Sequence, residues 1–89
     1  MILIADSGAT KTDWCYDTIG GAYMQVQTEG INPFHQSAEY IRHILEDQLV
    51  PRCTVPADIC TGIFFYGAGC LPSVSAPVTE ALQDLFPKA

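Results

Sequence analysis

The hydrophobic pattern of the chain changes its period near Ser37, and this change limits the possible folds more than any other feature. Before Ser37, apolar residues come in short runs of strand length that polar turns separate. The predicted strands cover residues 2–5, 12–17 and 22–28. In the second of them acidic and aromatic side chains alternate, which is typical of a strand with one buried face. Short turns, one of them containing Gly20-Gly21, join the strands and predict an antiparallel meander.

After Ser37 the apolar residues recur at helical spacing. These residues are Ala38, Ile41, Ile44, Leu45 and Leu49. Ser37 is the predicted N-cap of this helix, and Pro51 is predicted to end it. A fourth strand over 59–66 and a second helix over 77–86 follow. Because a strand that is reached through a helix lies parallel to a neighbour, the order β-β-β-α-β-α predicts an α/β fold with a mixed sheet.

Composition argues against several classes of protein. The 89 residues suffice for one small domain. A net charge of −6 with only four basic residues argues against a nucleic-acid partner. No apolar run approaches the ~20 residues of a membrane span, and the first residues lack the basic segment of a secretory signal. The four cysteines form no CxxC pair, so we expect reduced thiols in a cytoplasmic protein rather than a zinc site or a disulfide framework.

The first predicted strand ends in Asp6, and a polar turn follows it. The turn consists of Ser7, Gly8, Ala9, Thr10, Lys11 and Thr12. A hairpin turn of this kind presents backbone N–H groups around a small concavity that suits anionic oxygens, and its hydroxyl groups and lysine add further donors. Asp6 would lie within reach of a Mg²⁺ ion. The alternative interpretation is a solvated β-turn with the same composition.

Three stretches of the chain resemble a known group of proteins. DSGATKTDW (residues 6–14) resembles the first phosphate motif of the actin, sugar kinase and heat-shock ATPase superfamily. More narrowly, it is similar to that of the bacterial N-acetylglucosamine kinases grouped with the BadF/BadG/BcrA/BcrD ATPases, although Ser7 stands where a glycine is often found. TEGINPF (28–34) and FYGAGC (65–70) also resemble that branch. The resemblance implies the N-terminal portion of an actin-like ATPase (ribonuclease H-like) domain.

The resemblance also implies a reaction and a set of site residues. The reaction would be phosphoryl transfer from Mg-ATP to a sugar hydroxyl, with N-acetylglucosamine as the leading substrate. Asp6 would hold Mg²⁺ through water, and residues 7–12 would wrap the ATP phosphates. Asn32 would bind a sugar hydroxyl, although an asparagine before a proline is also a common turn former. The cleft near the sugar would be lined by Gly67, Ala68 and Gly69, which could also simply end the fourth strand.

Parts of such a kinase have no counterpart in the sequence. By the resemblance, the catalytic aspartate would follow the second helix, and the second phosphate motif and adenosine pocket would belong to a second domain. We therefore expect residues 1–89 to be an incomplete N-terminal lobe that is inactive alone, and whether this chain is itself an enzyme stays open. The alternatives are a BadF/BadG-type ATPase that activates a partner enzyme and a non-catalytic interaction module. The expected partners are a sugar and ATP, not a membrane or nucleic acid, with self-association through an exposed sheet edge or apolar face.

Overall fold

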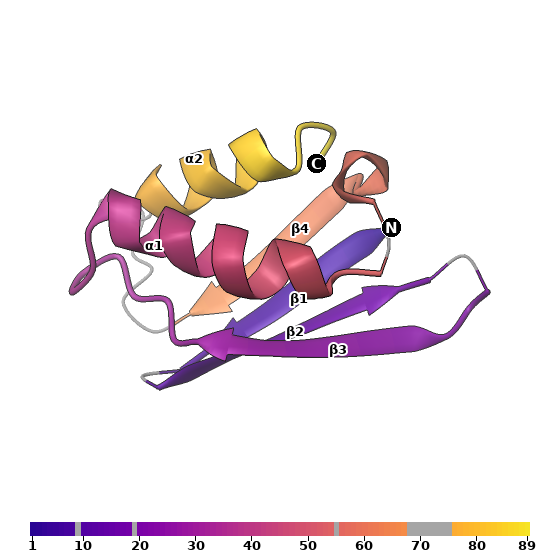
Figure 1. Cartoon of the computed structure of the whole chain (residues 1–89), viewed down its shortest axis with the longest axis horizontal. Coiled ribbons are helices and arrows are strands. Elements are labelled where there is room, and N and C mark those ends of the chain that lie inside the picture. Colours follow the sequence, from indigo (N-terminus) through magenta and orange to yellow (C-terminus); the bar gives the residue numbers. More distant parts are fainter. Residues whose placement is uncertain (9, 19, 55, 68–75) are drawn as a thin grey trace.

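The computed structural model describes residues 1–8, 10–18, 20–54, 56–67 and 76–89, and their elements follow the predicted order (Figure 1). The strands and α-helices are β1 (Ile2–Ser7), β2 (Lys11–Asp17), β3 (Tyr23–Glu29), α1 (Ala38–Ile44), β4 (Gly62–Gly67) and α2 (Ala76–Leu85). Each predicted strand before Ser37 is within two residues of the observed one. Ser37 caps α1 as predicted, because its hydroxyl accepts a hydrogen bond from the Tyr40 N–H.

The four strands form one mixed sheet in the order β3-β2-β1-β4. β2 pairs antiparallel with both β1 and β3, and β4 pairs parallel with β1. The sheet class predicted from the order of elements is therefore confirmed. Because β2 runs against its neighbours, β1, β3 and β4 all end at the same end of the sheet, and β2 begins there.

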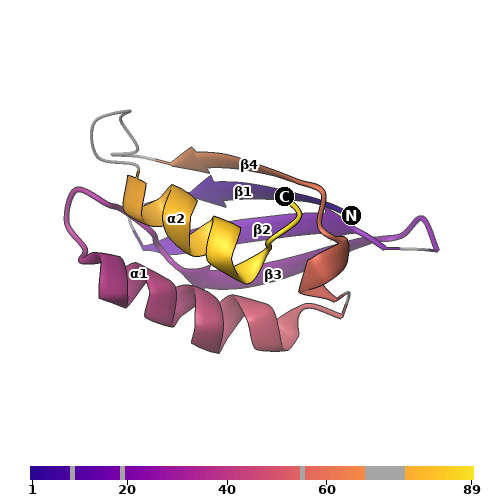
Figure 2. The same ribbon diagram turned by 90° about the horizontal axis from the view of Figure 1, so that it is seen from above.

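Both helices cover the same face of the sheet, as the view from above shows (Figure 2). The alternation in β2 places Trp14 and Tyr16 under the helices, while Asp13 and Asp17 lie on the other face. The buried residues of α1 and the following turn are Ile41, Ile44, Leu45 and Leu49, and those of α2 include Val78, Ala81 and Leu82. We call the face without helices the open face. None of the described helices has the length and apolar character that crossing a bilayer requires.

Three details differ from the sequence predictions. The α-helical part of the first helix ends at Ile44 and continues as a π-helical segment (Leu45–Leu49) and a 3₁₀ turn (Val50–Arg52). Proline has no N–H to continue the helical ladder, and the chain tightens there into the 3₁₀ turn. Ala38, predicted on the buried stripe, is exposed in the first turn of α1.

The fourth strand starts at Gly62 rather than at residue 59. Residues Ala57–Ile59 form a 3₁₀ turn instead, in which the Ile59 N–H donates to the Pro56 carbonyl at 3.2 Å. Alignment with β1 begins with the Thr61 N–H, which donates to the Met1 carbonyl at 2.9 Å. The β-prone residues before it therefore serve as a connection.

Candidate functional site

The three stretches that carry the resemblance meet at one end of the sheet. Ser7, at the end of β1, lies opposite Thr12 of β2 on one side and Gly67 of β4 on the other. The loop after β3 reaches the same place, because Ile31 is hydrogen-bonded to the Ser7 side chain. In α/β sheets ligands bind beyond the carboxyl ends of the strands. This end of the sheet is therefore the candidate site.

The turn after β1 divides its side chains between solvent and interior. Gly8, Thr10 and Lys11 are exposed, whereas Ser7 and Thr12 are buried. The Gly8 N–H donates to the Lys11 carbonyl at 2.8 Å and closes the hairpin. Ala9 lies outside the described residues. The accessible side-chain donors that the described part of the turn offers an anion are therefore the Thr10 hydroxyl and the Lys11 ammonium.

Two carboxylates lie side by side on the open face near this turn. Asp6 and Asp13 are direct neighbours across β1 and β2, and both line a hollow of about 620 Å³ together with Gln27. The Gln27 amide donates to Asp13 Oδ1 at 2.9 Å. Like charges placed directly across a sheet repel each other, and a divalent cation would relieve that repulsion. The described residues contain no group of three metal-ligating side chains, so a Mg²⁺ ion here would need water or phosphate oxygens as its other ligands.

The loop that contains Asn32 is held by side-chain hydrogen bonds. Asn32 Oδ1 accepts from the Phe34 N–H at 2.9 Å, so this residue does form the turn named above as the alternative to sugar binding. Gln36 ties the loop further: its Oε1 accepts from the Asn32 N–H at 2.7 Å, and its Nε2 donates to the Gly30 carbonyl at 2.8 Å. Only the Nδ2 group of Asn32 is left to donate to a ligand in this arrangement.

The sequence analysis did not identify the side chains that hold the loop and the turn of this site in place. Gln36 carried no recognisable signal. The resemblance implies that Ser7 and Thr12 contact phosphate, but their hydroxyls face the interior and lie 2.8 Å apart. Strand alternation could have indicated this, because Ser7 has the parity of buried Leu3 and Ala5.

The remaining predicted residue that the structure describes is Gly67, the half-buried last residue of β4. Tyr66 precedes it and lies next to Asp6 on the open face, where its side chain is 63% exposed. Ala68 and Gly69 lie outside the described residues. The third stretch thus reaches the site through Tyr66 and Gly67.

The cysteines that the structure describes are free thiols. Burial raises the pKa of Cys53 and of Cys60 above the ordinary value of 9.0. Both thiols therefore stay protonated near neutral pH. Cys70 lies outside the described residues.

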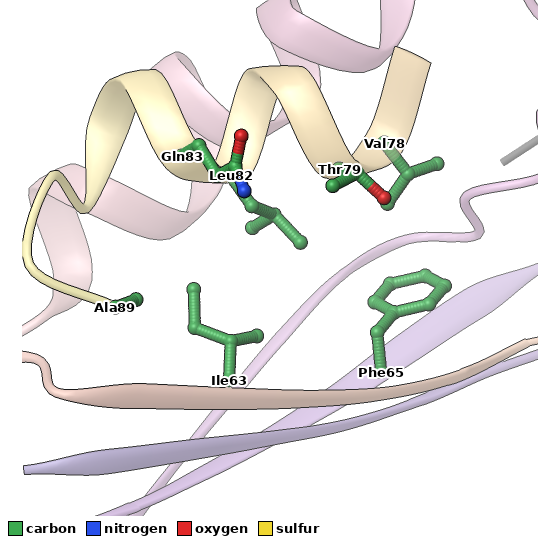
Figure 3. A pocket seen from close by; sticks show the side chains of 7 residues that line it. All are labelled: Ile63, Phe65, Val78, Thr79, Leu82, Gln83 and Ala89. Carbon is green, nitrogen blue, oxygen red and sulfur yellow. The ribbon is translucent and has the colours of Figure 1, made fainter. Parts of the chain in front are cut away.

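A second hollow lies away from the strand ends, between α2 and β4 (Figure 3). It has a volume of about 330 Å³, and Ile63 and Phe65 of β4 point into it toward Val78 and Leu82 of α2. Its lining contains no ionisable side chain among the seven residues. This hollow is a gap in helix–sheet packing, and its polar side chains are the uncharged Thr79 and Gln83.

The mixed sheet, the helices on one face and the polar turn after the first strand make up the N-terminal portion of an actin-like ATPase domain, the fold class of sugar kinases. Over its whole length the chain is similar to the crystal structure described as the putative N-acetylglucosamine kinase of Porphyromonas gingivalis, with 42% sequence identity and a TM-score of 0.89. The match covers 100% of this chain and 31% of that chain, so the sequence spans about a third of the length of that protein. Neither a protein-family model nor a curated protein matches the chain.

Proposed function

We propose that this chain is the N-terminal part of an ATP-dependent sugar kinase that phosphorylates N-acetylglucosamine. The observation that carries the proposal is that the three stretches that resemble the kinases converge at the carboxyl ends of β1, β3 and β4. The likeness to a putative N-acetylglucosamine kinase along the whole chain supports the same reaction and sugar. A cytoplasmic location is part of the proposal, because ATP is the donor.

In this proposal the turn after β1 receives the phosphates of ATP. Lys11 supplies a positive charge and Thr10 a hydroxyl donor, while Gly8 lets the ligand approach the backbone closely. Asp6 orients a Mg²⁺ ion through water, with Asp13 as its neighbour on β2. When bound, Mg²⁺ would neutralise charge on the phosphate oxygens during transfer.

The acceptor sugar lies on the other side of Ser7, at the loop after β3 and the end of β4. Asn32 donates from Nδ2 to a sugar hydroxyl, since its Oδ1 is held by the Phe34 N–H. Gly67 lines the cleft with a backbone that carries no side chain, whereas the assignment of Ala68 and Gly69 to the same lining stays a prediction from the sequence, because both lie outside the described residues. Sugar and phosphate would thus be positioned by adjacent segments, which is the main requirement of phosphoryl transfer.

The 89-residue chain does not carry out the transfer alone. A catalytic base must reach both the acceptor hydroxyl and the γ-phosphate. Asp84 is engaged instead with Arg42 on the exposed side of the helices, at 2.6 Å, and Asp58 lies at the opposite end of β4. Neither carboxylate is placed for that task.

Coupled ADP-release assays with N-acetylglucosamine, glucose and glucosamine test the proposal. A full-length kinase that carries this segment should phosphorylate N-acetylglucosamine in preference to the other two sugars. The 89-residue chain should give no sugar-dependent turnover. Turnover by the chain above roughly 1 s⁻¹, an ordinary kinase rate, would contradict its assignment as an incomplete lobe.

Two substitutions of Asn32 test the sugar site in the same full-length enzyme. Asn32→Asp keeps the oxygen that forms the turn but removes the Nδ2 donor, whereas Asn32→Ala removes both. We expect each to raise KM for the sugar far more than KM for ATP, by a factor that corresponds to about 1–3 kcal/mol. Only Asn32→Ala should also lower thermal stability. If Asn32→Asp changes KM for the sugar and KM for ATP equally, Asn32 does not bind the sugar.

A further inference from the structure

We propose that the buried hydroxyls of Ser7 and Thr12 couple the phosphate turn to the loop after β3, so that a ligand held by one segment repositions the other. This inference rests on the proposed function, because it takes the turn (residues 8–11) and the loop (residues 30–32) as two halves of one site. It assigns Ser7 and Thr12 a positioning role in place of direct contact between their side chains and phosphate.

The geometry centres on the Ser7 hydroxyl. Ser7 Oγ lies 2.8 Å from Thr12 Oγ1 and 2.9 Å from both the amide nitrogen and the carbonyl oxygen of Ile31. Thr12 Oγ1 also lies 3.0 Å from the Glu29 carbonyl oxygen. Ser7, Thr12 and Ile31 are 4%, 0% and 0% exposed, so water does not compete for the contacts among these three residues. One hydroxyl pair thus joins the end of β1, the start of β2 and the loop after β3.

The proton count gives this network a direction. A serine hydroxyl donates one proton and accepts at two lone pairs. If Thr12 donates to Ser7 and Ser7 donates to the Ile31 carbonyl, both lone pairs of Ser7 are used, by Thr12 and by the Ile31 N–H. The reverse direction, from Ser7 to Thr12 to Glu29, would leave the buried Ile31 carbonyl without this donor, which is unfavourable.

The neighbouring bonds make the first direction self-consistent. The Glu29 carbonyl receives a proton from the Thr28 hydroxyl at 3.0 Å, and that hydroxyl accepts from Trp14 Nε1 at 3.0 Å. Thr12 can donate its proton either to the Glu29 carbonyl or to Ser7, and when the proton goes to Ser7 the Thr28 hydroxyl still supplies the Glu29 carbonyl with a donor. In the described part of the chain every buried side-chain nitrogen or oxygen has a partner. The network is complete, and a completed buried network holds its members rigidly.

The position of the network explains how it would transmit a displacement. Ser7 directly precedes the phosphate turn and Thr12 directly follows it, so both ends of the turn are attached to the same hydroxyl pair. Ser7 is hydrogen-bonded to both the N–H and the carbonyl of Ile31, and Ile31 directly precedes Asn32. A close-packed interior has low compressibility and transmits displacements. A shift of the turn on binding phosphate therefore moves the backbone of Asn32.

The test follows amide signals of the 89-residue chain by NMR while Mg-ATP is added at millimolar concentrations. In the wild type, the Gly8 and Lys11 signals and the Ile31 and Asn32 signals should shift together, with one common Kd. Ser7→Ala and Thr12→Val each remove a hydroxyl of the pair. In both variants the turn should still respond, and the loop response should fall below half of its wild-type size.

Two further variants control this experiment. Thr18→Ala removes a hydroxyl that bonds the Ala22 carbonyl at 3.0 Å in the opposite hairpin, so the loop should respond as in the wild type. Thr12→Ser keeps the hydroxyl that Thr12→Val lacks and removes only the methyl group, so its loop should respond as in the wild type. If Ser7→Ala does not fold, the comparison of Thr12→Val with Thr12→Ser decides.

The contrary outcomes are distinct. If the turn shifts but the loop does not in the wild type, or if the loop response survives in the folded hydroxyl variants, the coupling is wrong and the proposed phosphate site stands. If no turn signal shifts in the wild type, the phosphate site on this chain is wrong and the coupling falls with it.

Discussion

Strand alternation divides the residues of the candidate site between two tasks. Ser7 and Thr12 have the inward parity of their strands, and their hydroxyls bind one another and the backbone. Asp6 and Asp13 have the outward parity, and their carboxylates lie on the open face beside a hollow. A one-residue change in register would exchange these sets. The inward residues thus shape the site, and the outward residues are available to a ligand.

Replacing Asp6 by asparagine should separate stability from activity. The change removes one charge from the Asp6–Asp13 pair, so the midpoint of thermal unfolding should be unchanged or slightly higher. In a full-length kinase that carries this segment, kcat should fall severely, because the carboxylate that we propose to orient Mg²⁺ is lost. Thermal melting and steady-state kinetics measure both effects, with Asp58→Asn at the far end of β4 as the control. A kcat close to that of the wild type would remove Asp6 from the metal site.

Glu29 should make stability depend on pH in the acid range. Its carboxylate accepts hydrogen bonds from the Tyr40 hydroxyl and the Gln48 amide, each at 2.7 Å, and these bonds lower the pKa of Glu29 below its ordinary value of 4.5. A lowered pKa means that the folded state binds this proton less tightly than the unfolded chain does. The stabilisation is therefore complete above the ordinary pKa and is lost as the pH falls through the lowered one.

The variant Tyr40→Phe removes the larger of these two causes. We expect it to reduce the loss of unfolding free energy as the pH falls below 4.5, as measured by urea denaturation at a series of pH values. Tyr23→Phe serves as the control, because it removes the hydroxyl of an exposed tyrosine at the other end of β3. The same pH dependence in Tyr40→Phe and the wild type would show that the Tyr40 bond contributes nothing.

The helices are held to each other and to the sheet by apolar contacts more than by charge. Ile41 of α1 is fully buried in the core that both helices share with the sheet. The ion pair between Arg42 of α1 and Asp84 of α2 is short, at 2.6 Å, but its side chains are 37% and 64% exposed. Solvent screens such a pair and the ordering of long side chains offsets its attraction.

These two contacts between elements should differ clearly on substitution. Ile41→Ala should lower the free energy of unfolding by about 2–5 kcal/mol, through lost burial and the cavity left behind. Arg42→Ala should lower it by at most about 1 kcal/mol, since the Arg42–Asp84 pair is exposed. Urea denaturation of both variants gives the comparison. A larger effect for Arg42→Ala would mean that the ion pair, and not the core, holds α1 and α2 together.

The molecule as a whole leaves its open face uncovered by described helices, and β4 lies at an edge of the sheet (Figure 2). The large apolar side chains exposed on β1 and β4 are Ile2, Ile4, Phe64 and Tyr66. β4 also contains no charged residue or proline, the features that commonly protect an edge strand from pairing with another chain. Both features favour contact with further polypeptide.

Self-association of the 89-residue chain should therefore increase with concentration, and Phe64→Lys should weaken it by removing apolar surface and adding charge to β4. Sedimentation velocity over a range of concentrations measures the effect. Gln25→Lys adds the same charge to β3 without removing an apolar side chain, and it should associate nearly as the wild type does. If only Gln25→Lys blocks association, the contact lies over β2 and β3 instead of at the β4 edge.

Local sequence was enough to obtain the order of elements, the mixed sheet and the N-cap at Ser37. These features depend on hydrophobic period, turn residues and capping, all of which act between residues close in the chain. It also sufficed to select the polar turn as a candidate site. The boundary near residue 59 was less predictable, because a short apolar run suits a strand or a connection equally well.

Packing decided what each polar residue in the site does. Ser7 and Ile31 are 24 positions apart, and their hydrogen bonds exist only because the loop after β3 passes over the end of β1. The pairing of Asp6 with Asp13 likewise depends on the register of two strands. A serine or an aspartate in a turn has the same local propensity whether it faces water or the interior. The role of such a residue is set by the partners that tertiary structure brings to it, because a buried hydroxyl must find a hydrogen bond and an exposed one is served by water.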